Sequence, residues 1–406
     1  MKGFFTKQET ISKERPTGKI NSCASCGLYK NCQHPKMGIT GNGRKNILII
    51  GPSNSSQDDE SGTRWLSREG QVLSSELKKY GINLYEDCYH INAVNCYTNE
   101  RHKGKLSLAV NCCRKTVLKA IEKLSPDSII LLGTEAVMSV IGHRWKAGDL
   151  DTIDKWRGWI IPDQEFKAWI CPTIAPEFLI QGKEEVKTVF SNDIRRIIPF
   201  LDKKVPRYKF PDYIPLQSLK TLKQITSGII CFDYETTGLK PEDEGHKIVC
   251  MSIYSTQLNK LFSFPIPEKK KKLKPVLKLL TNPAIGKRAH NMKFEDKWTS
   301  VIFGVDVQNW EFDSQIAAHQ LDNRFGVTGL KFQTYVNFGI VDYSSSVAEF
   351  LKSKGRNANE KNTILELIKT KEGMDKLLTY CAYDSWFEYL LSEKQQAELN
   401  FDGLPF

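Results

Sequence analysis

Short apolar runs and helical patterns alternate along the first half of the chain. The runs are NILIIG (46–51), SIILLG (128–133) and AWICPTI (168–174). Between them, segments such as GQVLSSELKKYG (70–81) and KTVLKAIEKL (115–124) space their apolar residues three and four positions apart. Short apolar runs bounded by turn residues are typical of buried strands, and strands that alternate with helices form parallel sheets covered by helices. This half therefore predicts a parallel-sheet α/β domain.

A different order of elements follows a proline-rich seam. Three apolar runs come in succession, GIICFDYE (228–235), KIVCMSIYS (247–255) and NKLFSFPIP (259–267), and the rest of the chain is mostly helical in pattern. Successive strands followed by helices predict a mixed sheet flanked by helices. The seam PFLDKKVPRYKFPDYIPL has four prolines and no helical period, which is typical of a linker. We expect an N-terminal tail 1–19, a first domain 20–198, a linker 199–216, a second domain 217–395 and a C-terminal tail 396–406.

Charge and cysteine content narrow the class of protein. The 406 residues have a formal net charge of +11 and a pI near 9.0, which favours a polyanionic partner. No apolar run approaches the ~20 residues that span a bilayer. The first residues lack the apolar core and cleavage site of a signal peptide, so the eleven cysteines are expected to be reduced thiols or metal ligands. We expect a cytoplasmic protein without a membrane partner.

Two carboxylates stand one residue apart at the end of an apolar run. Asp233 and Glu235 share a face of the expected strand, because side chains alternate along a strand. Two acids on one face repel each other unless a partner such as a hard divalent cation neutralises them. Further along, AHNMKFEDKW (289–298) and YCAYD (380–384) add acids and a tyrosine, the latter pair at the helical spacing of four.

In this order the pieces resemble the DnaQ-like 3′–5′ exonucleases, specifically the proofreading domains of family A DNA polymerases. The family's D-x-E, N-x-x-[FY]-D and Y-x-x-x-D motifs are matched except that a glutamate replaces the second motif's aspartate. The resemblance implies two Mg²⁺ or Mn²⁺ ions held by four acids, a tyrosine that orients the attacking water, and contacts to DNA beside the second motif. The implied residues are Asp233, Glu235, Glu295 and Asp384 for the metals, Tyr380 for the water, and Asn291 and Lys293 for DNA. Asp296 is the rival to Glu295 as the third acid.

Four cysteines of the first half form a second candidate metal site. CASC places Cys23 and Cys26 at C-x2-C spacing, and Cys96 and Cys113 follow with sixteen residues between them. Four thiolates suit an iron–sulfur cluster or zinc. Blocks such as GPSNS, GTRWLSREG, INAVNC, CRKTVLKAIEKLSP and PTIAPEFL resemble the iron–sulfur uracil-DNA glycosylases of families four and five. The resemblance implies a 4Fe–4S cluster, with Zn²⁺ as the alternative and Cys32 as a spare thiol.

The match fails at the positions that the resemblance assigns to glycosylase catalysis. The family's water-activating glutamate is Pro52 here, and its histidine is Ala175. The uracil-stacking phenylalanine corresponds to Trp65, and the uracil-reading asparagine is kept as Asn92. Proline and alanine can neither polarise a leaving base nor activate water. We expect a glycosylase fold that holds DNA without cleaving it, with Asp58 or Asp59 as possible substitutes.

Such a pair of domains resembles the front part of certain large-phage DNA polymerases. The sequence offers no palm motif after residue 395, so we expect a polymerase subunit on a separate chain. The tail QAELNF (396–401) and the apolar residues Leu399, Phe401, Leu404 and Phe406 are expected to be exposed and to dock on that polymerase or on a sliding clamp. Two alternatives to a proofreading exonuclease stay open: a bifunctional uracil-DNA glycosylase and exonuclease, and a non-catalytic DNA-binding scaffold.

Overall fold

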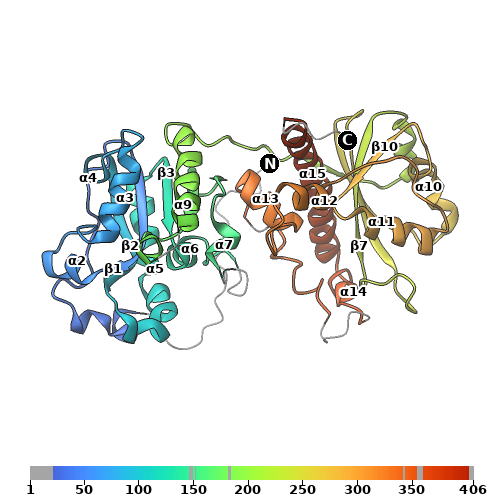
Figure 1. Cartoon of the computed structure of the whole chain (residues 1–406). Helices are drawn as coiled ribbons and strands as arrows, with labels where there is room; N and C mark the ends of the chain where they lie inside the picture. Colours follow the sequence, from blue (N-terminus) through green and yellow to red (C-terminus); the bar gives the residue numbers. More distant parts are fainter. Residues whose placement is uncertain are drawn as a thin grey trace. The chain divides into compact units, whose positions relative to one another are not determined.

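Two compact units make up the computed structural model, Met1–Arg207 and Tyr208–Phe406, and each is described by itself. Figure 1 shows a sheet with covering helices in each unit. No described helix is both long and apolar enough to cross a membrane. The structure describes residues 22–145, 150, 152–181, 184–341, 343–353 and 360–401.

A five-stranded sheet forms the centre of the first unit, in the order β2 (Cys88–Tyr97), β1 (Ile47–Asn54), β3 (Ser128–Leu132), β5 (Ala168–Thr173) and β4 (Ile161–Asp163). The first four strands are parallel, and β4 pairs with β5 in the antiparallel sense. The predicted parallel-sheet α/β class is therefore confirmed. The helices are α1 (Cys23–Cys26), η1 (Leu28–Asn31), α2 (Ser56–Ser61), α3 (Arg68–Lys78), α4 (Leu84–Asp87), η2 (Glu100–Lys105), α5 (Leu106–Leu124), α6 (Thr134–Val140), α7 (Ile153–Trp156), α8 (Glu177–Gln181), α9 (Glu184–Ile197) and η4 (Ile198–Phe200).

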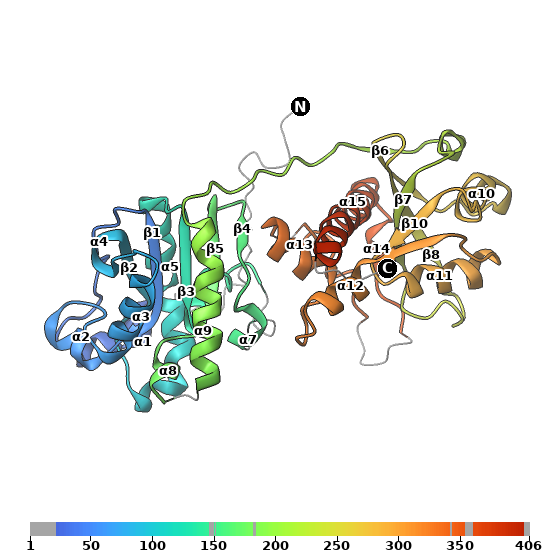
Figure 2. The ribbon, with the colours of Figure 1, turned by 45° about the horizontal axis from the view of Figure 1, so that its top comes forward.

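The central strands of this sheet are buried on both faces. Every residue of β3 is buried, and β1, β3 and β5 run side by side in Figure 2. Ile47 and Ile130 pack in one core with the apolar residues of α3 and α9, while Val94 packs in another with Val110 of α5. Burial on both faces explains why these strands read as continuous apolar runs.

The second unit contains a six-stranded mixed sheet, in the order β11 (Trp310–Asp313), β10 (Gly286–Ala289), β7 (Ile229–Thr236), β8 (Ile248–Ser255), β9 (Lys260–Pro265) and β6 (Tyr213–Pro215). β7, β8 and β9 are antiparallel neighbours, and β10 runs parallel to both β7 and β11. The predicted mixed sheet is confirmed. The helices are η5 (Leu219–Gln224), η6 (Lys270–Leu273), α10 (Lys274–Leu280), α11 (Met292–Trp298), the π-helical η7 (Thr299–Phe303), α12 (Ser314–Leu321), α13 (Leu330–Phe338), α14 (Ile364–Leu367) and α15 (Lys371–Phe401).

Alternation along β7 sorts its residues between two layers. Ile230, Phe232 and Tyr234 pack in a core with Trp298 of α11 and with apolar residues of α10. The intervening residues face the long helix α15, which lies against β7, β8 and β9. The period of two therefore brings the acids of this strand under α15.

The linker and the C-terminal tail both differ from the sequence expectation. The expected linker 199–216 ends in a strand, because Tyr213–Pro215 pairs with β9. The expectation that the tail 396–406 is frayed and exposed is wrong for its first part, because α15 continues to Phe401 and Leu399 is 1% exposed. Leu399 packs with Phe312 and Ala317. The tail positions 402–406, which include Leu404 and Phe406, lie outside the described residues.

Candidate functional sites

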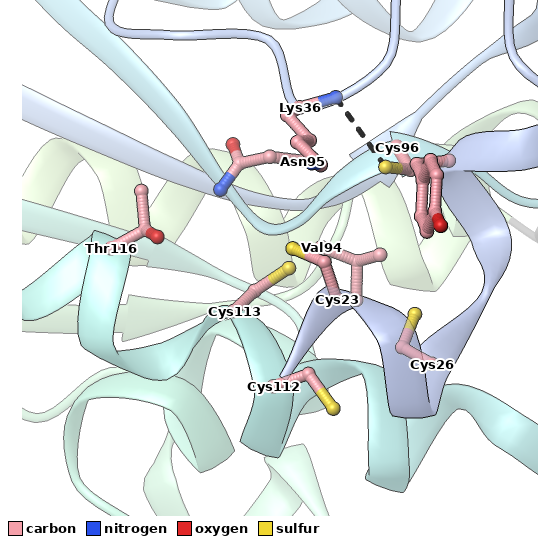
Figure 3. Close-up of a pocket in the computed structure, with 10 residues that line it drawn as sticks. Cys23, Cys26, Lys36, Val94, Asn95, Cys96, Cys112, Cys113 and Thr116 are labelled. Carbon is pink, nitrogen blue, oxygen red and sulfur yellow. Dashed lines mark hydrogen bonds between the residues drawn. The ribbon is translucent and has the colours of Figure 1, made fainter. Parts of the chain in front are cut away.

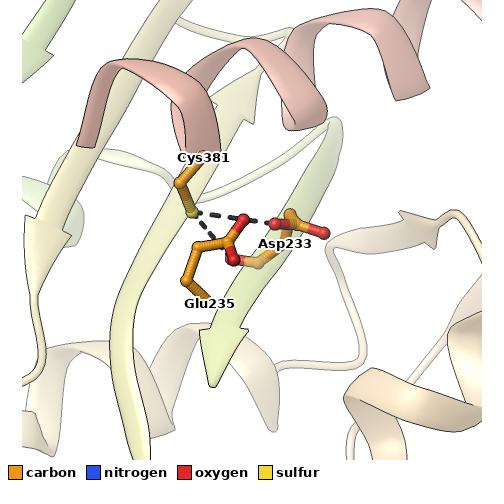
Figure 4. A group of neighbouring side chains, drawn as sticks. All are labelled: Asp233, Glu235 and Cys381. Atoms are coloured by element: carbon orange, nitrogen blue, oxygen red, sulfur yellow. Dashed lines mark hydrogen bonds between the residues drawn. The ribbon is translucent and has the colours of Figure 1, made fainter. Parts of the chain in front are cut away.

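The two acids of β7 lie together under helix α15. A carboxylate oxygen of Asp233, one of Glu235 and the sulfur of Cys381 all lie within 4.8 Å of one another (Figure 4). The Cys381 thiol is 3.6 Å from the backbone oxygen of Asp233 and 3.7 Å from its Oδ2. Asp233 is only partly buried, whereas Glu235 is 7% exposed. The pair sits at the border between core and surface.

Helix α15 adds a carboxylate and a phenol to the same place. Tyr380 and Asp384 are one helical turn apart, and both are buried. The Tyr343 hydroxyl donates a hydrogen bond to Asp384 Oδ1, and the Tyr343 ring stacks on Tyr380 with centroids 5.8 Å apart. The Lys331 Nζ lies 4.8 Å from the centre of the Tyr380 ring. The motif reasoning found neither Tyr343 nor Lys331, which stand outside the three motifs.

Helix α11 supplies the remaining acid. Its N-cap Asn291 has a left-handed backbone (φ 72°), and Asp313 accepts hydrogen bonds from the amides of Asn291 at 3.0 Å and Met292 at 2.9 Å. One turn on, Glu295 is 2% exposed, and its Oε2 has no hydrogen-bond partner among the described residues. Asp296 instead accepts a hydrogen bond from Trp310 Nε1 at 3.1 Å. Glu295, not Asp296, thus turns into the interior, while Lys293 is exposed.

Electrostatics shows that the four acids act on one another. Burial raises the pKa of Asp233 well above its usual range, and the charge of Asp384 raises it further. Burial and the charge of Asp233 likewise raise the pKa of Glu235 and of Glu295. Burial also raises the pKa of Asp384, while the nearby Lys331 lowers it. Such a cluster binds protons unless cations compensate its charge, and hard divalent cations prefer carboxylate oxygens.

A buried polar network lies behind these acids. The Ser314 hydroxyl donates to Glu388 Oε2, and His290 Nδ1 is 2.8 Å from Ser314 Oγ. Glu388 is 1% exposed, and its Oε1 has no partner among the residues described. Burial raises the pKa of Glu388 to about 8. Glu388 acts electrostatically on both Asp233 and Glu295, so the network belongs to the surroundings of the acids.

The four predicted cysteine ligands line one pocket of the first unit. Cys23 and Cys26 come from α1, Cys96 from the end of β2 and Cys113 from α5, and Cys112 also lines the pocket (Figure 3). The Lys36 amide donates to the Cys96 sulfur at 3.4 Å. Burial raises the pKa of Cys96 to about 12 and also raises that of Cys113. Burial thus favours the protonated form of Cys96 and Cys113, and a metal that binds them must displace these protons.

Cys32, the spare thiol of the sequence analysis, is not among the residues that line this pocket. Its sulfur donates to the backbone oxygen of Leu28 at 3.3 Å. In the described part of the chain, the pocket's sulfurs do not form a group of three within 4.8 Å of one another. Sulfurs that share one zinc ion lie about 3.8 Å apart, because Zn–S bonds are about 2.3 Å long and tetrahedral. The thiols are spread more widely than one zinc ion requires.

The Trp65 ring packs against Gly51 of β1, beside Asn92. A Cβ added to Gly51 would lie 2.7 Å from the Trp65 ring and 2.6 Å from Asn92 Oδ1, so ring and amide both lie against this glycine. Trp65 is 7% exposed, and its φ of 66° is an outlier for a bulky residue. Tyr85 Oη donates to the Trp65 backbone oxygen at 2.9 Å. A Cβ on Gly70 would lie 1.9 Å from that same oxygen, so residue 70 must be glycine for this backbone. The strained conformation is thus held from two sides.

Some polar groups near this ring pair within the protein, whereas Trp65 Nε1 and Asn92 Oδ1 are buried with no hydrogen-bond partner among the described residues. Asn92 Nδ2 donates to Asn54 Oδ1 at 2.8 Å. Asp58 accepts hydrogen bonds from the amides of Ser55 and Leu66, which caps α2 and fixes the loop.

Asp59 is used in the same way. It accepts hydrogen bonds from the amides of Gln33 and His34, both at 2.9 Å. Both aspartates are buried, and their carboxylates accept hydrogen bonds from backbone amides. A general base instead needs a carboxylate that reaches a water beside the substrate. Ala175, at the position of the family histidine, is buried against Gly133.

Comparison with known proteins identifies relatives of the first unit. Residues 39–199 match the family model of the uracil DNA glycosylase superfamily. A type-4 uracil-DNA glycosylase of Thermotoga maritima is 27% identical over 203 residues, which are 50% of this chain and 100% of the relative. One of Pyrobaculum aerophilum is 29% identical over 138 residues, which are 32% of this chain and 67% of the relative. The first unit is thus similar to uracil-DNA glycosylases.

Solved structures similar to the chain include nucleases. Brucella melitensis NrnC with bound Mg²⁺ is 20% identical with a TM-score of 0.35, covering 47% of this chain and 81% of that one. Escherichia coli RNase D, described as an exoribonuclease involved in structured RNA processing, is 16% identical with a TM-score of 0.35. This match covers 48% of this chain and 46% of RNase D.

Proposed function

We propose that the second unit is a metal-dependent 3′–5′ exonuclease that acts on DNA, as a proofreading or trimming activity. The observation that carries this proposal is the clustering of Asp233 and Glu235 within 4.8 Å of each other, with two further acids close enough to act on them. The charge of Asp384 raises the pKa of Asp233, and the charge of Asp233 raises the pKa of Glu295. Glu295 Oε2 is buried and has no hydrogen-bond partner in the described part of the chain, which costs free energy unless a cation or ligand satisfies it. The motif resemblance to the DnaQ-like exonucleases supports the same assignment.

The donor set fits Mg²⁺ or Mn²⁺. All four acids offer carboxylate oxygens, which are the preferred ligands of these ions. In two-metal sites this chemistry supplies an activated water and relief of charge on the leaving oxygen. The chain's own contribution is to orient these groups, because Tyr343 holds Asp384 by a hydrogen bond and packs on Tyr380. Tyr380 would position the attacking water with its hydroxyl.

DNA is the proposed substrate because the chain is basic and because its first unit is similar to enzymes that act on uracil in DNA. Asn291 and Lys293 stand at the start of α11, one turn before Glu295, and Lys293 is exposed. In this proposal they would contact a strand whose 3′ end enters the acidic cluster.

The first unit, in this proposal, holds DNA but does not excise uracil. Pro52 and Ala175 replace the two groups that the resemblance assigns to catalysis. Trp65, whose ring lies against Gly51, would fill the base pocket that the resemblance implies. Asp58 and Asp59 do not restore the chemistry, since their carboxylates hold backbone amides. A 4Fe–4S cluster bound by Cys23, Cys26, Cys96 and Cys113 would tie α1 to β2 and α5. The resemblance to the iron–sulfur glycosylases favours this cluster over zinc.

The polymerase subunit and the sliding clamp stay predictions from the sequence. The docking of the tail on either partner was expected from its exposed apolar residues, and Leu399 is instead buried within the second unit. The described part of the tail, at the end of α15, thus packs against the second unit through Leu399.

Nuclease assays on variants that replace single acids by the matching amides test the proposal. Glu295→Gln, Asp233→Asn and Asp384→Asn should each slow degradation of a 5′-labelled DNA strand by more than about 100-fold in Mg²⁺. A lost metal interaction removes several kcal/mol of charge stabilisation, and each 1.36 kcal/mol is tenfold in rate. Asp296→Asn is the control and should keep wild-type activity, because Asp296 faces Trp310.

Fluorescence anisotropy should show that the inactive variants still bind DNA, and an RNA strand of the same sequence tests the choice of substrate. Wild-type rates in Asp233→Asn and Asp384→Asn would refute the assignment. Faster cleavage of RNA than of DNA would keep the nuclease and overturn the substrate.

A further inference from the structure

Cys381 is placed as a third ligand beside the two acids of β7. Its side chain is fully buried between α15 and the sheet. Its sulfur and the carboxylate oxygens of Asp233 and Glu235 lie within 4.8 Å of one another, and Figure 4 shows the three side chains converging. Ser252 Oγ donates to the Cys381 backbone oxygen at 2.6 Å, which fixes this turn of α15 against β8. The thiol is therefore held toward the carboxylates by the packing of the helix.

A second observation points to a cation at this place. Glu295 is 2% exposed, its Oε2 has no partner among the described residues, and the charge of Asp233 acts on it more than any other charge does. A buried carboxylate oxygen without a donor is rare unless an ion or water satisfies it. Ligands that share one ion at 2.0–2.3 Å lie roughly 3–4 Å apart, so the three atoms need only small shifts to share one ion.

We propose that Asp233, Glu235 and Cys381 form a mixed carboxylate–thiolate site that binds a thiophilic cation of the Zn²⁺ class more tightly than a purely carboxylate site would. The proposal deepens the proposed function, on which it rests, by naming the determinant of metal preference. Oxygen ligands suit Mg²⁺ and Mn²⁺, whereas thiolate selects Zn²⁺ and softer cations. On coordination the thiol releases its proton to solvent, and the sulfur becomes a thiolate ligand.

Zinc affinity with matched thiol variants tests the proposal. Full-length protein, purified anaerobically with its first-unit cysteines unchanged, is titrated with Zn²⁺ in competition with a chromophoric chelator, and separately with Mg²⁺ by calorimetry. Cys381→Ser and Cys381→Ala should each weaken one Zn²⁺ site by at least about tenfold. Loss of even an outer-shell partner costs a metal site 10- to 100-fold in affinity. Mg²⁺ affinity should stay unchanged in both variants, which also shows that they fold.

Cys231→Ser is the control. Cys231 is a buried thiol of β7, the strand that contains Asp233 and Glu235, and it packs among Tyr254, Leu261 and Ala382. It should keep wild-type Zn²⁺ affinity. Zinc X-ray absorption of the wild-type protein should show one sulfur at about 2.3 Å that the Cys381 variants lack. Unchanged Zn²⁺ affinity in those variants, or only oxygen and nitrogen neighbours in the wild type, would overturn the proposal.

The outcome separates this inference from the proposed function. If the protein is an active nuclease with Mg²⁺ and its Zn²⁺ affinity does not change in the Cys381 variants, only the thiolate ligand is overturned. Cys381-dependent Zn²⁺ binding in a protein without nuclease activity overturns the exonuclease and keeps the metal site.

Discussion

Glu388 offers a test of the electrostatics around the acidic cluster that does not depend on catalysis. It lies on α15 one turn after Asp384, is 1% exposed, and accepts a hydrogen bond from Ser314. Burial raises its pKa from 4.5 to about 8, and the charge of Asp313 adds to the increase while the Ser314 hydrogen bond and Arg288 oppose it. The folded protein thus holds a proton at neutral pH that the unfolded chain releases.

The sign and size of the effect follow from this difference. Between pH 4.5 and about 8 the folded state binds one more proton at this site than the unfolded state, so stability falls as pH rises. The stabilisation is complete below pH 4.5 and is lost as pH passes about 8. One pKa unit corresponds to 1.36 kcal/mol, so the free energy of unfolding falls by about 1.4 kcal/mol per pH unit. Glu388→Gln removes this term and should gain about 3 kcal/mol on the wild type between pH 5 and 7.5.

The measurement is urea denaturation at several pH values in EDTA, with pulsed hydrogen exchange on peptides from β7 and α15. Peptide resolution is needed because two compact units can unfold separately. Glu398→Gln is the control, since Glu398 lies on the same helix, is half-exposed and pairs with Lys394 at 2.6 Å. Its pH profile should parallel the wild type. A Glu388→Gln profile that also stays parallel to the wild type from pH 5 to 7.5 would show that Glu388 is ionised in the fold.

Three further predictions concern the first unit and the end of α15. Cys113→Ser should bleach the brown colour of anaerobically purified protein and lower its iron content, because one of four ligands is lost; stoichiometric zinc without iron in the wild type would contradict the cluster. Uracil-containing DNA should give no alkali-labile sites with the wild type, and Pro52→Glu with Ala175→His should act only when Trp65→Phe also opens the pocket. Leu399→Ala should lower the free energy of unfolding of the second unit by about 2–3 kcal/mol in urea denaturation, since it empties a buried leucine site; an unchanged value would mean that this end of α15 is frayed.

The sequence predictions that concern a single strand or helix followed from the regular spacing of its residues. The apolar runs became strands, and alternation along β7 put Asp233 and Glu235 on one face of the sheet. The spacing of four put Tyr380 and Asp384 on one face of α15. In each case the geometry depends only on the local repeat of a strand or a helix, which the sequence contains in full.

Residues that join the site only through tertiary packing could not be predicted from local spacing. Tyr343 stands in VDYSSS, which has the composition of a turn, and its hydrogen bond to Asp384 spans 41 positions. Lys331 lies on α13, and only the packing of α13 against α15 brings it over Tyr380. Cys381 stands within the YCAYD motif, and the sequence pattern there does not distinguish a metal ligand from an ordinary buried cysteine. Such contacts depend on tertiary packing, which no local pattern encodes.

The choice between Glu295 and Asp296 shows what local pattern and tertiary structure each decide. A helix turns about 100° per residue, so the two acids cannot face the same way, but the sequence does not say which one faces inward. That depends on where α11 begins, and the beginning is set by Asn291 in its left-handed conformation and by Asp313, which binds the first amides from β11's end. With the start fixed there, Glu295 turns toward Asp233 and Asp296 toward Trp310. Asp313, which lies 22 positions after Asn291, thus helps to determine which carboxylate of a neighbouring pair is available to a metal.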